Sequence, residues 1–252
     1  MTLHHDGFLS FDGVRIAWTE LGQGRPILLL HGLFSNGATN WRKYGAAAEI
    51  AAAGYRVIMP DFRAHGDSAA PAEAAHYPPD VLALDIEALV RHLDLGDFDL
   101  GGYSLGARTV VRLLARGLRP ARAVLGGMGL AGLTGGAERA QWFLNVIANR
   151  DTVQPGTAEY GAAQFMKQNG IDAEAVAHVL RSQQATPQAV LQTLATPTLV
   201  VCGVQDQDNG SAPDLALVLP AASYLEIPGN HMSAVTRPDF GTAIAAWLQH
   251  RS

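Results

Sequence analysis

A serine between two glycines stands where an apolar, strand-like run passes directly into a helical pattern. The segment Gly102-Tyr103-Ser104-Leu105-Gly106 follows the apolar residues 98–102 and leads into a helical pattern over 107–115. Side chains two residues before and after the serine would collide across a sharp strand-to-helix turn, so glycine is preferred at both places. The pattern predicts a strained turn that holds the Ser104 hydroxyl clear of the backbone at a helix N-terminus. With 27 glycines in the chain, a structural turn carrying an uninvolved serine is the alternative.

The rest of the chain alternates short apolar runs with helical segments, which is typical of a mostly parallel sheet flanked by helices. Asp12-Gly13 between two β-rich runs predicts an N-terminal hairpin. Continuous apolar runs such as Ile27-Leu28-Leu29-Leu30 predict buried parallel strands. We therefore expect about eight strands, at residues 8–11, 14–19, 27–30, 55–59, 98–102, 122–127, 198–203 and 224–227.

Helical periodicity occupies the intervening segments and dominates one long stretch. We expect helices over residues 41–53, 80–93, 107–116, 212–219 and 238–249. Between residues 130 and 196 no strand pattern occurs, and helices are expected over 137–150, 157–169, 172–184 and 187–194. This order of strands and helices predicts a core formed by residues 1–129 and 197–252. Residues 130–196 are inserted before the last two strands as a helical lid, or cap.

Composition and charge exclude several classes of protein. The formal net charge of −5 and the scattered arginines argue against a nucleic-acid partner, which needs a clustered basic surface. The single cysteine, Cys202, excludes an internal disulfide, and its apolar neighbours predict a buried structural thiol. No leader-like N-terminus and no apolar run of membrane-spanning length are apparent, so a cytoplasmic protein with no membrane partner is expected.

A serine hydroxyl needs a base within hydrogen-bond reach, and that base is usually a histidine oriented by a carboxylate. His231 lies in a turn after the last predicted strand, and Asp206 follows the strand at 198–203. Ser104 also follows a strand, and the carboxyl ends of parallel strands share one edge of the sheet. The spacing Gly203-x-x-Asp206 favours Asp206 as the acid, although Asp208 and Asp214 lie nearby. His231 as an ordinary loop histidine is the alternative to its role as the base.

Five motifs in this order resemble those of the α/β-hydrolase fold family, in its small serine esterase-like form, over nearly the whole chain. The resemblance implies that Ser104, Asp206 and His231 form a catalytic triad, in the chain order typical of that family. It also implies an oxyanion hole formed by the backbone N–H groups of Leu33 and Leu105. The motifs are His31-Gly32, Asp61-x-Arg63-x-x-Gly66-x-Ser68, Gly102-Tyr103-Ser104-Leu105-Gly106, Gly203-x-x-Asp206 and Gly229-Asn230-His231.

The chain departs from the family's pattern at one glycine. The second motif often reads Asp-x-Arg-Gly-x-Gly-x-Ser, and here Ala64 replaces the first glycine. The sequence alone therefore does not predict the backbone conformation of this loop at Ala64. The oxyanion loop, His31-Gly32-Leu33-Phe34, also differs from the HGGG type of many lipases, which favours a simple backbone oxyanion hole.

A serine nucleophile predicts acyl transfer, whereas an aspartate at position 104 would favour dehalogenase or epoxide-hydrolase chemistry. We expect a carboxylesterase-like hydrolase acting on an ester or related acyl bond of a small to medium apolar substrate, without a cofactor or metal. The same triad can serve carbon–carbon bond or lactone hydrolysis, and proteins of this fold can also act as small-molecule receptors with little turnover. The substrate and the oligomeric state are not indicated by the sequence.

Several other side chains are expected to have structural roles. We expect Asp61, Arg63 and His65 to hold a loop together and His31 to pack beneath the oxyanion loop. We expect Tyr103 and Leu105 to line the pocket. In the cap, the residues Trp142, Phe143, Phe165 and Met166 are expected to serve packing more than substrate contact.

Overall fold

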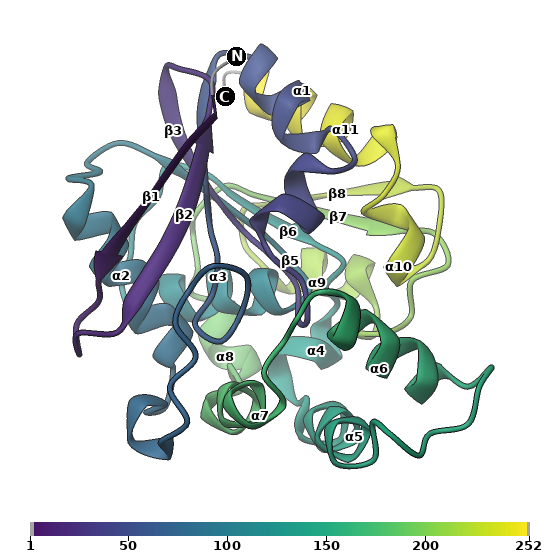
Figure 1. Cartoon of the computed structure of the whole chain (residues 1–252). Coiled ribbons are helices and arrows are strands. Elements are labelled where there is room, and N and C mark those ends of the chain that lie inside the picture. The colour runs from purple at the N-terminus through teal and green to yellow at the C-terminus, as the bar shows by residue number, and fades with distance from the viewer. Residues whose placement is uncertain (1–2, 251–252) are drawn as a thin grey trace.

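The computed structural model describes residues 3–250, and one mixed sheet runs through the middle of that part of the chain (Figure 1). Its eight strands lie in the order β1-β2-β4-β3-β5-β6-β7-β8. β1 and β2 form an antiparallel hairpin, β2 pairs with β4 antiparallel, and all other neighbours are parallel. The predicted α/β class is confirmed. The strands are β1 (Leu3–Leu9), β2 (Arg15–Leu21), β3 (Arg25–Leu30), β4 (Tyr55–Pro60), β5 (Asp99–Tyr103), β6 (Ala123–Gly126), β7 (Thr198–Gly203) and β8 (Ala222–Ile227).

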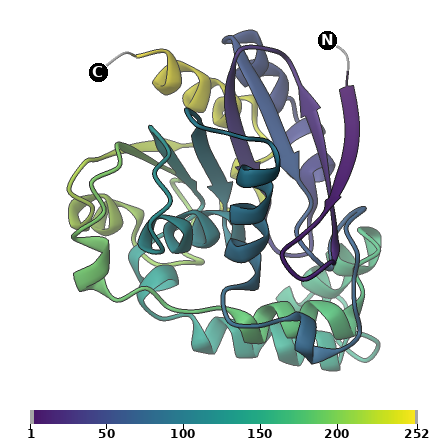
Figure 2. The ribbon, with the colours of Figure 1, turned by 90° about the vertical axis from the view of Figure 1, so that its left-hand side faces the viewer.

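Helices cover both faces of the sheet (Figures 1 and 2). One face carries α1 (Ala46–Ala52) and α11 (Pro238–Gln249), which pack against each other. The opposite face carries α2 (Val81–His92), α3 (Leu105–Ala115) and α9 (Ala212–Val218). Because side chains alternate along a strand, a buried strand must be apolar at every position to serve two such faces.

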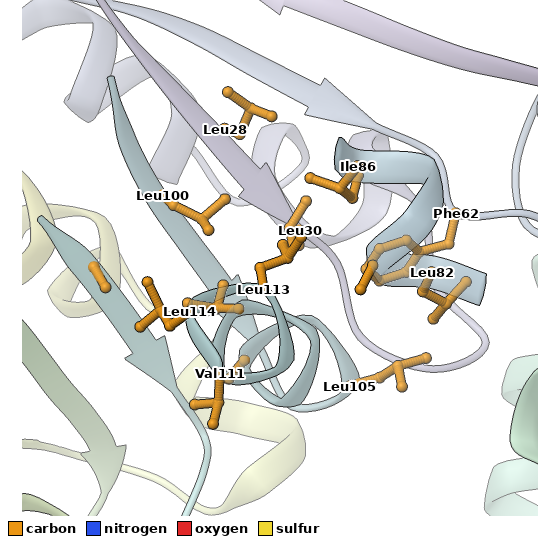
Figure 3. Packing of buried hydrophobic residues seen from close by; sticks show 14 of the residues in the cluster. Leu28, Leu30, Phe62, Leu82, Ile86, Leu100, Leu105, Val111, Leu113 and Leu114 are labelled. Atoms are coloured by element: carbon orange, nitrogen blue, oxygen red, sulfur yellow. The ribbon is translucent and has the colours of Figure 1, made fainter. Parts of the chain in front are cut away.

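The strand β3 shows this requirement directly. Ile27 and Leu29 belong to the cluster under α1 and α11, whereas Leu28 and Leu30 belong to the cluster under α2 and α3. All four side chains are fully buried. Figure 3 shows the second cluster, in which the helix residues Val111, Leu113 and Leu114 of α3 pack near Leu100 of β5. This two-sided burial holds the carboxyl ends of β3 and β5 side by side.

Five helices lie between β6 and β7, where the sequence predicts the cap. In Figure 1 they gather at the lower end of the molecule, away from α1 and α11. Residues of the cap form a separate apolar cluster that includes Ile147, Met166 and Val176. The division into a core and a cap domain at residues 129/130 and 196/197 stays a prediction. The five helices are α4 (Leu130–Thr134), α5 (Ala137–Ala148), α6 (Ala158–Gln168), α7 (Ala173–Ser182) and α8 (Gln188–Leu191).

The structure differs from the sequence-based expectation in four local features. The expected helix over residues 41–53 is two pieces, a π-helical turn (Ala38–Arg42) and α1, separated at Gly45, whose φ is 90°. β1 begins earlier than expected, at Leu3. Two short helices were not expected: α4, and α10 (His231–Ala234), which replaces the expected turn. A 3-10 turn also occurs at Ala74–His76. No helix among residues 3–250 combines the length and apolarity needed to cross a membrane.

Candidate active site

Ser104 occupies the strained turn that the sequence predicts between β5 and α3. Its backbone has φ 54° and ψ −112°, a conformation that non-glycine residues rarely adopt. A Cβ on Gly102 would lie 2.3 Å from the carbonyl carbon of Gly106, and one on Gly106 would lie 2.1 Å from the carbonyl oxygen of Leu30. Both glycines are therefore required by close backbone approach. The serine hydroxyl lies at the N-terminus of an 11-residue helix.

The structure brings Ser104, His231 and Asp206 into one hydrogen-bonded chain. His231 Nε2 lies 3.0 Å from Ser104 Oγ, and His231 Nδ1 lies 2.8 Å from Asp206 Oδ2. His231 and Asp206 are both buried. The three residues come from the ends of β5, β7 and β8, so the sheet edge predicted from the sequence is the place where they meet. The geometry is that required for a base which deprotonates a serine.

Asp206 reaches His231 because the ends of β7 and β8 approach closely. A Cβ on Gly203 would lie 2.3 Å from the carbonyl oxygen of Gly229, so only glycine permits this approach. The amide of Gln205 then donates to the Gly229 carbonyl at 3.0 Å. The competing carboxylates lie elsewhere. Asp208 pairs with Arg139 of the cap, and Asp214 accepts no hydrogen bond from His231 among the described residues.

The carboxylate of Asp206 is kept ionised by its neighbours. Burial raises its pKa, but the hydrogen bond and charge of His231 and the amide of Asp208 more than offset burial, so the pKa is lowered overall. Cys202 also contributes, because its thiol donates to Asp206 Oδ2 at 3.5 Å. Burial, and then the charge of Asp206, raise the pKa of Cys202 to about 12, so the thiol stays protonated. This agrees with the expectation of a structural thiol.

The two amides assigned to the oxyanion hole have no hydrogen-bond acceptor within residues 3–250. Leu105 is the first residue of α3, where backbone N–H groups have no intrahelical partner. Leu33 lies in the turn after β3, and the amides on either side of it are occupied. Gly32 donates to Asn40 Oδ1 at 2.9 Å, and Phe34 donates to His65 Nε2 at 3.3 Å. Leu33 is therefore left with a free donor in a loop held on both sides.

His31 and His65 support this loop from below, as expected of structural histidines. Both are fully buried, and each accepts a backbone hydrogen bond through Nε2, His31 from Phe62 and His65 from Phe34. Burial lowers the pKa of His31 to about 4. Burial and the neighbouring His31 lower the pKa of His65 to about 3. Both rings are therefore neutral at pH 7, the state in which a ring nitrogen can accept.

Arg63 and Asp61 have structural roles in the following loop, as expected. Arg63 is completely buried and pairs with Asp12 at 2.7 Å and with Asp85 at 2.7 Å. Asp61 accepts the backbone amides of Gly37 and Asp67. Ala64, which replaces the usual glycine, has φ 65°. The loop therefore keeps the left-handed conformation typical of glycine despite the alanine.

Three functional contacts were missed from the sequence. Tyr103 is buried, and its hydroxyl donates to the backbone carbonyl of His231 at 2.5 Å. Asn40 holds Gly32, and Cys202 holds Asp206. The contact of Tyr103 with His231 spans 128 residues, and the other two depend on the conformation of the loops after β3 and β7, which periodicity does not predict. A polar residue at the end of an apolar strand, such as Cys202 or Tyr103, was the available signal.

The cap closes over the oxyanion loop through apolar contacts. Phe34 belongs to the buried cluster of the cap, and its ring lies edge-on to Phe143 of α5 with the ring centroids 5.5 Å apart. Met166 is buried in the same cluster, and Phe165 packs against it. Trp142 bonds instead to Glu159 through its indole N–H. Phe143, Phe165 and Met166 therefore serve packing, as expected, and Phe143 contacts the loop through Phe34.

A family model described as alpha/beta hydrolase fold matches residues 25–164. The chain therefore belongs to the α/β-hydrolase fold family. It is 38% identical over 103 residues to a putative non-heme chloroperoxidase of Synechocystis sp., a match covering 41% of this chain and 36% of that protein. It is 37% identical over 99 residues to an epoxide hydrolase of Caballeronia sordidicola, covering 39% of this chain and 29% of the other. The chain thus spans about a third of the length of these relatives.

Solved structures match the whole fold at low sequence identity. An esterase from Thermogutta terrifontis superposes with a TM-score of 0.79 at 23% identity, covering 98% of each chain. An esterase from Exiguobacterium antarcticum superposes with a TM-score of 0.78 at 18% identity, covering 97% of this chain and 99% of the other. At these identities the likeness shows the fold alone.

Proposed function

We propose that this protein is a serine hydrolase that cleaves an ester or related acyl bond of a small to medium apolar substrate. The observation that carries the proposal is the hydrogen-bonded chain from Ser104 Oγ through His231 to Asp206, at 3.0 and 2.8 Å. The backbone amides of Leu33 and Leu105, which have no acceptor among residues 3–250, also support it. The similarity to an epoxide hydrolase would by itself suggest a reaction with an aspartate nucleophile. The serine at position 104 argues against that reaction and for acyl transfer.

The geometry supports a two-step acyl transfer. His231 Nε2 takes the proton of Ser104 Oγ as this oxygen bonds to the substrate carbonyl carbon, and Asp206 stabilises the imidazolium through Nδ1. The amides of Leu33 and Leu105 stabilise the oxyanion, an interaction worth about 3 to 4 kcal/mol of barrier per donor in a comparable site. The imidazolium then protonates the leaving alcohol, and the C–O bond breaks. A water molecule repeats the sequence on the acyl-enzyme, which releases the acid and restores the serine.

The substrate class follows from the side chains near the nucleophile. Leu33 and Leu105 carry the two amides and are apolar, as is the following Phe34, which packs against Phe143 of the cap. Such surroundings favour an apolar acyl or alcohol group over a charged one. Carbon–carbon bond or lactone hydrolysis by the same triad, and ligand sensing without turnover, are the alternatives that the experiment must separate.

The test compares the wild type, Ser104→Ala and Ser223→Ala on p-nitrophenyl esters of two to eight carbons. Ser223→Ala makes the same chemical change at an exposed position on β8 and should leave activity unchanged. Ser104→Ala should lower kcat by about 10⁴-fold or more. A fluorophosphonate probe should label Ser104 in the wild type. Ester turnover that persists in Ser104→Ala contradicts the proposal, as does a wild type that neither turns over esters nor reacts with the probe. Labelling without ester turnover would point to a carbon–carbon or lactone substrate.

A further inference from the structure

Tyr103, the residue before the nucleophile, also touches the base. Its hydroxyl donates to the backbone carbonyl of His231 at 2.5 Å, and its ring centroid lies 5.3 Å from that of the imidazole. Tyr103 is 4% exposed and His231 is 8% exposed. The contact therefore joins two residues separated by 128 positions in the sequence, inside the protein and next to the triad.

The fold provides a slot for this side chain at the end of β6. A Cβ on Gly126 would lie 2.9 Å from Tyr103 Cδ2, and one on Gly127 would lie 2.6 Å from Tyr103 Cζ. Phe240 of α11 meets the Tyr103 ring edge-on, with centroids 5.4 Å apart. Gly126, Gly127 and Phe240 thus fix the position of the Tyr103 ring and its hydroxyl. No residue larger than glycine fits at position 126 or 127 while the ring is there.

The segment that carries His231 is short, and its internal hydrogen bonds centre on Asn230, whose side chain accepts the amides of Met232 and Ser233. It consists of a left-handed glycine, Gly229, and the four-residue helix α10. Asn230 is exposed, and Met232 is 58% exposed, so one side of the turn has little packing. A short helix of this kind is only marginally stable alone. Its position therefore also depends on contacts from neighbouring elements. Asp206 and Ser104 bond to the ring of His231, whereas the Tyr103 hydroxyl bonds to its backbone carbonyl.

We infer that Tyr103 is a positioning residue for His231, which ties the base to the strand that carries the nucleophile. The inference rests on the proposed function. Tyr103 and Ser104 share a peptide bond, so a hydrogen bond from Tyr103 to His231 makes the base and the nucleophile move together. Burial, and then the charge of Asp206, raise the pKa of the Tyr103 hydroxyl well above its usual value, so it stays a donor throughout the working pH range. A displacement of a catalytic group by about 1 Å can lower a rate by about 10²-fold. Loss of this hydrogen bond, which would let His231 shift relative to Ser104, should therefore lower kcat.

The experiment compares Tyr103→Phe with Tyr55→Phe as a matched control. Tyr55 is also buried, and its hydroxyl also donates to a backbone carbonyl, that of Leu248 at 3.0 Å, but it lies outside the triad. We expect Tyr103→Phe to lower kcat by about 10-fold to 10²-fold with KM changed less than about threefold. Fluorophosphonate labelling of Ser104 should slow in parallel. Tyr55→Phe should leave kcat and the labelling rate unchanged, even with a similar loss of stability.

An NMR measurement gives a second test, because its signal would not change if Tyr103 contributed only to stability. The proton between His231 Nδ1 and Asp206 should give a downfield NMR resonance, which should shift or broaden in Tyr103→Phe and not in Tyr55→Phe. If Tyr103→Phe does not fold, Phe240→Leu loosens the ring and keeps the hydroxyl, and kcat should fall a few-fold at unchanged KM. Turnover, labelling and resonance all unchanged would overturn the inference. Failure of the proposed function is distinct, because it appears in the wild type and in Ser104→Ala.

Discussion

The ring of Phe34 meets the ring of Phe143 edge-on, at 5.5 Å between centroids and 87° between planes. Phe34 follows the free amide of Leu33, and Phe143 belongs to α5 of the cap. Phe34 also has φ 59°, a left-handed conformation that is costly for a bulky residue. The strained residue is held by a cap side chain and by His65 together. The position of the cap is therefore coupled to the geometry of the oxyanion loop.

This coupling predicts the result of a double-mutant cycle. Phe34→Leu and Phe143→Leu each remove one ring, and an edge-on aromatic pair contributes about 0.5 to 1.5 kcal/mol beyond its buried area. We therefore expect a coupling energy of about 1 kcal/mol in urea unfolding, and a lower kcat in both single variants. Additive changes in the free energy of unfolding would show that the two rings do not interact.

Arg63 is predicted to be far more important for stability than an exposed arginine. Arg63→Met leaves Asp85, whose side chain is 1% exposed, without its cation, which should cost about 3 to 5 kcal/mol. Arg116→Met is the control, because Arg116 and Glu87 have side chains 30% and 19% exposed and their pair should contribute about 0.2 to 1 kcal/mol. Urea unfolding of both variants measures the difference. Equal losses would contradict the structural role of Arg63.

Ala64 should tolerate replacement by glycine better than a buried alanine in a helix. At φ 65° the alanine methyl is strained, and glycine relieves about 1 kcal/mol of that strain. Ala47 of α1 is also buried, and glycine in a helix costs about 1 kcal/mol. Ala64→Gly should thus be less destabilising than Ala47→Gly by about 2 kcal/mol in thermal or urea unfolding. If both substitutions destabilise equally, the loop does not hold Ala64 in the left-handed conformation.

The buried histidines predict loss of stability in mild acid. An unfolded histidine binds a proton below about pH 6.5, whereas folded His31 and His65 bind one only near pH 4 and 3. The unfolded state therefore takes up more protons, and stability falls as pH falls from 6.5 toward these values. Between pH 7 and pH 5 each histidine should remove about 2 kcal/mol from the free energy of unfolding.

Replacing one of the two histidines tests this prediction. His65→Gln keeps an acceptor for the Phe34 amide but cannot bind a proton in this range, so it should remove about half of the acid sensitivity. His4→Gln, at an exposed position, is the control and should leave the sensitivity intact. Urea unfolding at pH 7 and pH 5 measures both. An acid sensitivity that is the same in His65→Gln and in the wild type would contradict the buried, neutral ring.

The order of the core elements and the turn at Ser104 could be predicted from the amino-acid sequence. These features rest on local rules: strand and helix periodicity, and glycines where a side chain would strike the backbone. The segments Thr198–Gly203 and Pro238–Gln249 occur with the bounds expected for them. The helix over residues 41–53 was predicted wrongly as one piece, because Gly45 adopts a left-handed conformation that alanine-rich periodicity does not reveal.

Which side chains meet around Ser104 depends on the packing of the elements. The sequence placed Ser104, Asp206 and His231 at strand ends, and motif spacing singled them out, but their distances depend on how β5, β7 and β8 are packed. The sequence does not show which partners Tyr103, Cys202 and Asn40 contact, and the structure gives them as His231, Asp206 and Gly32. The first joins residues 128 positions apart, whereas the other two join residues 4 and 8 positions apart whose contact depends on how the loops after β7 and β3 fold back. Local patterns predict elements, whereas close contacts between elements depend on the packing of the whole core.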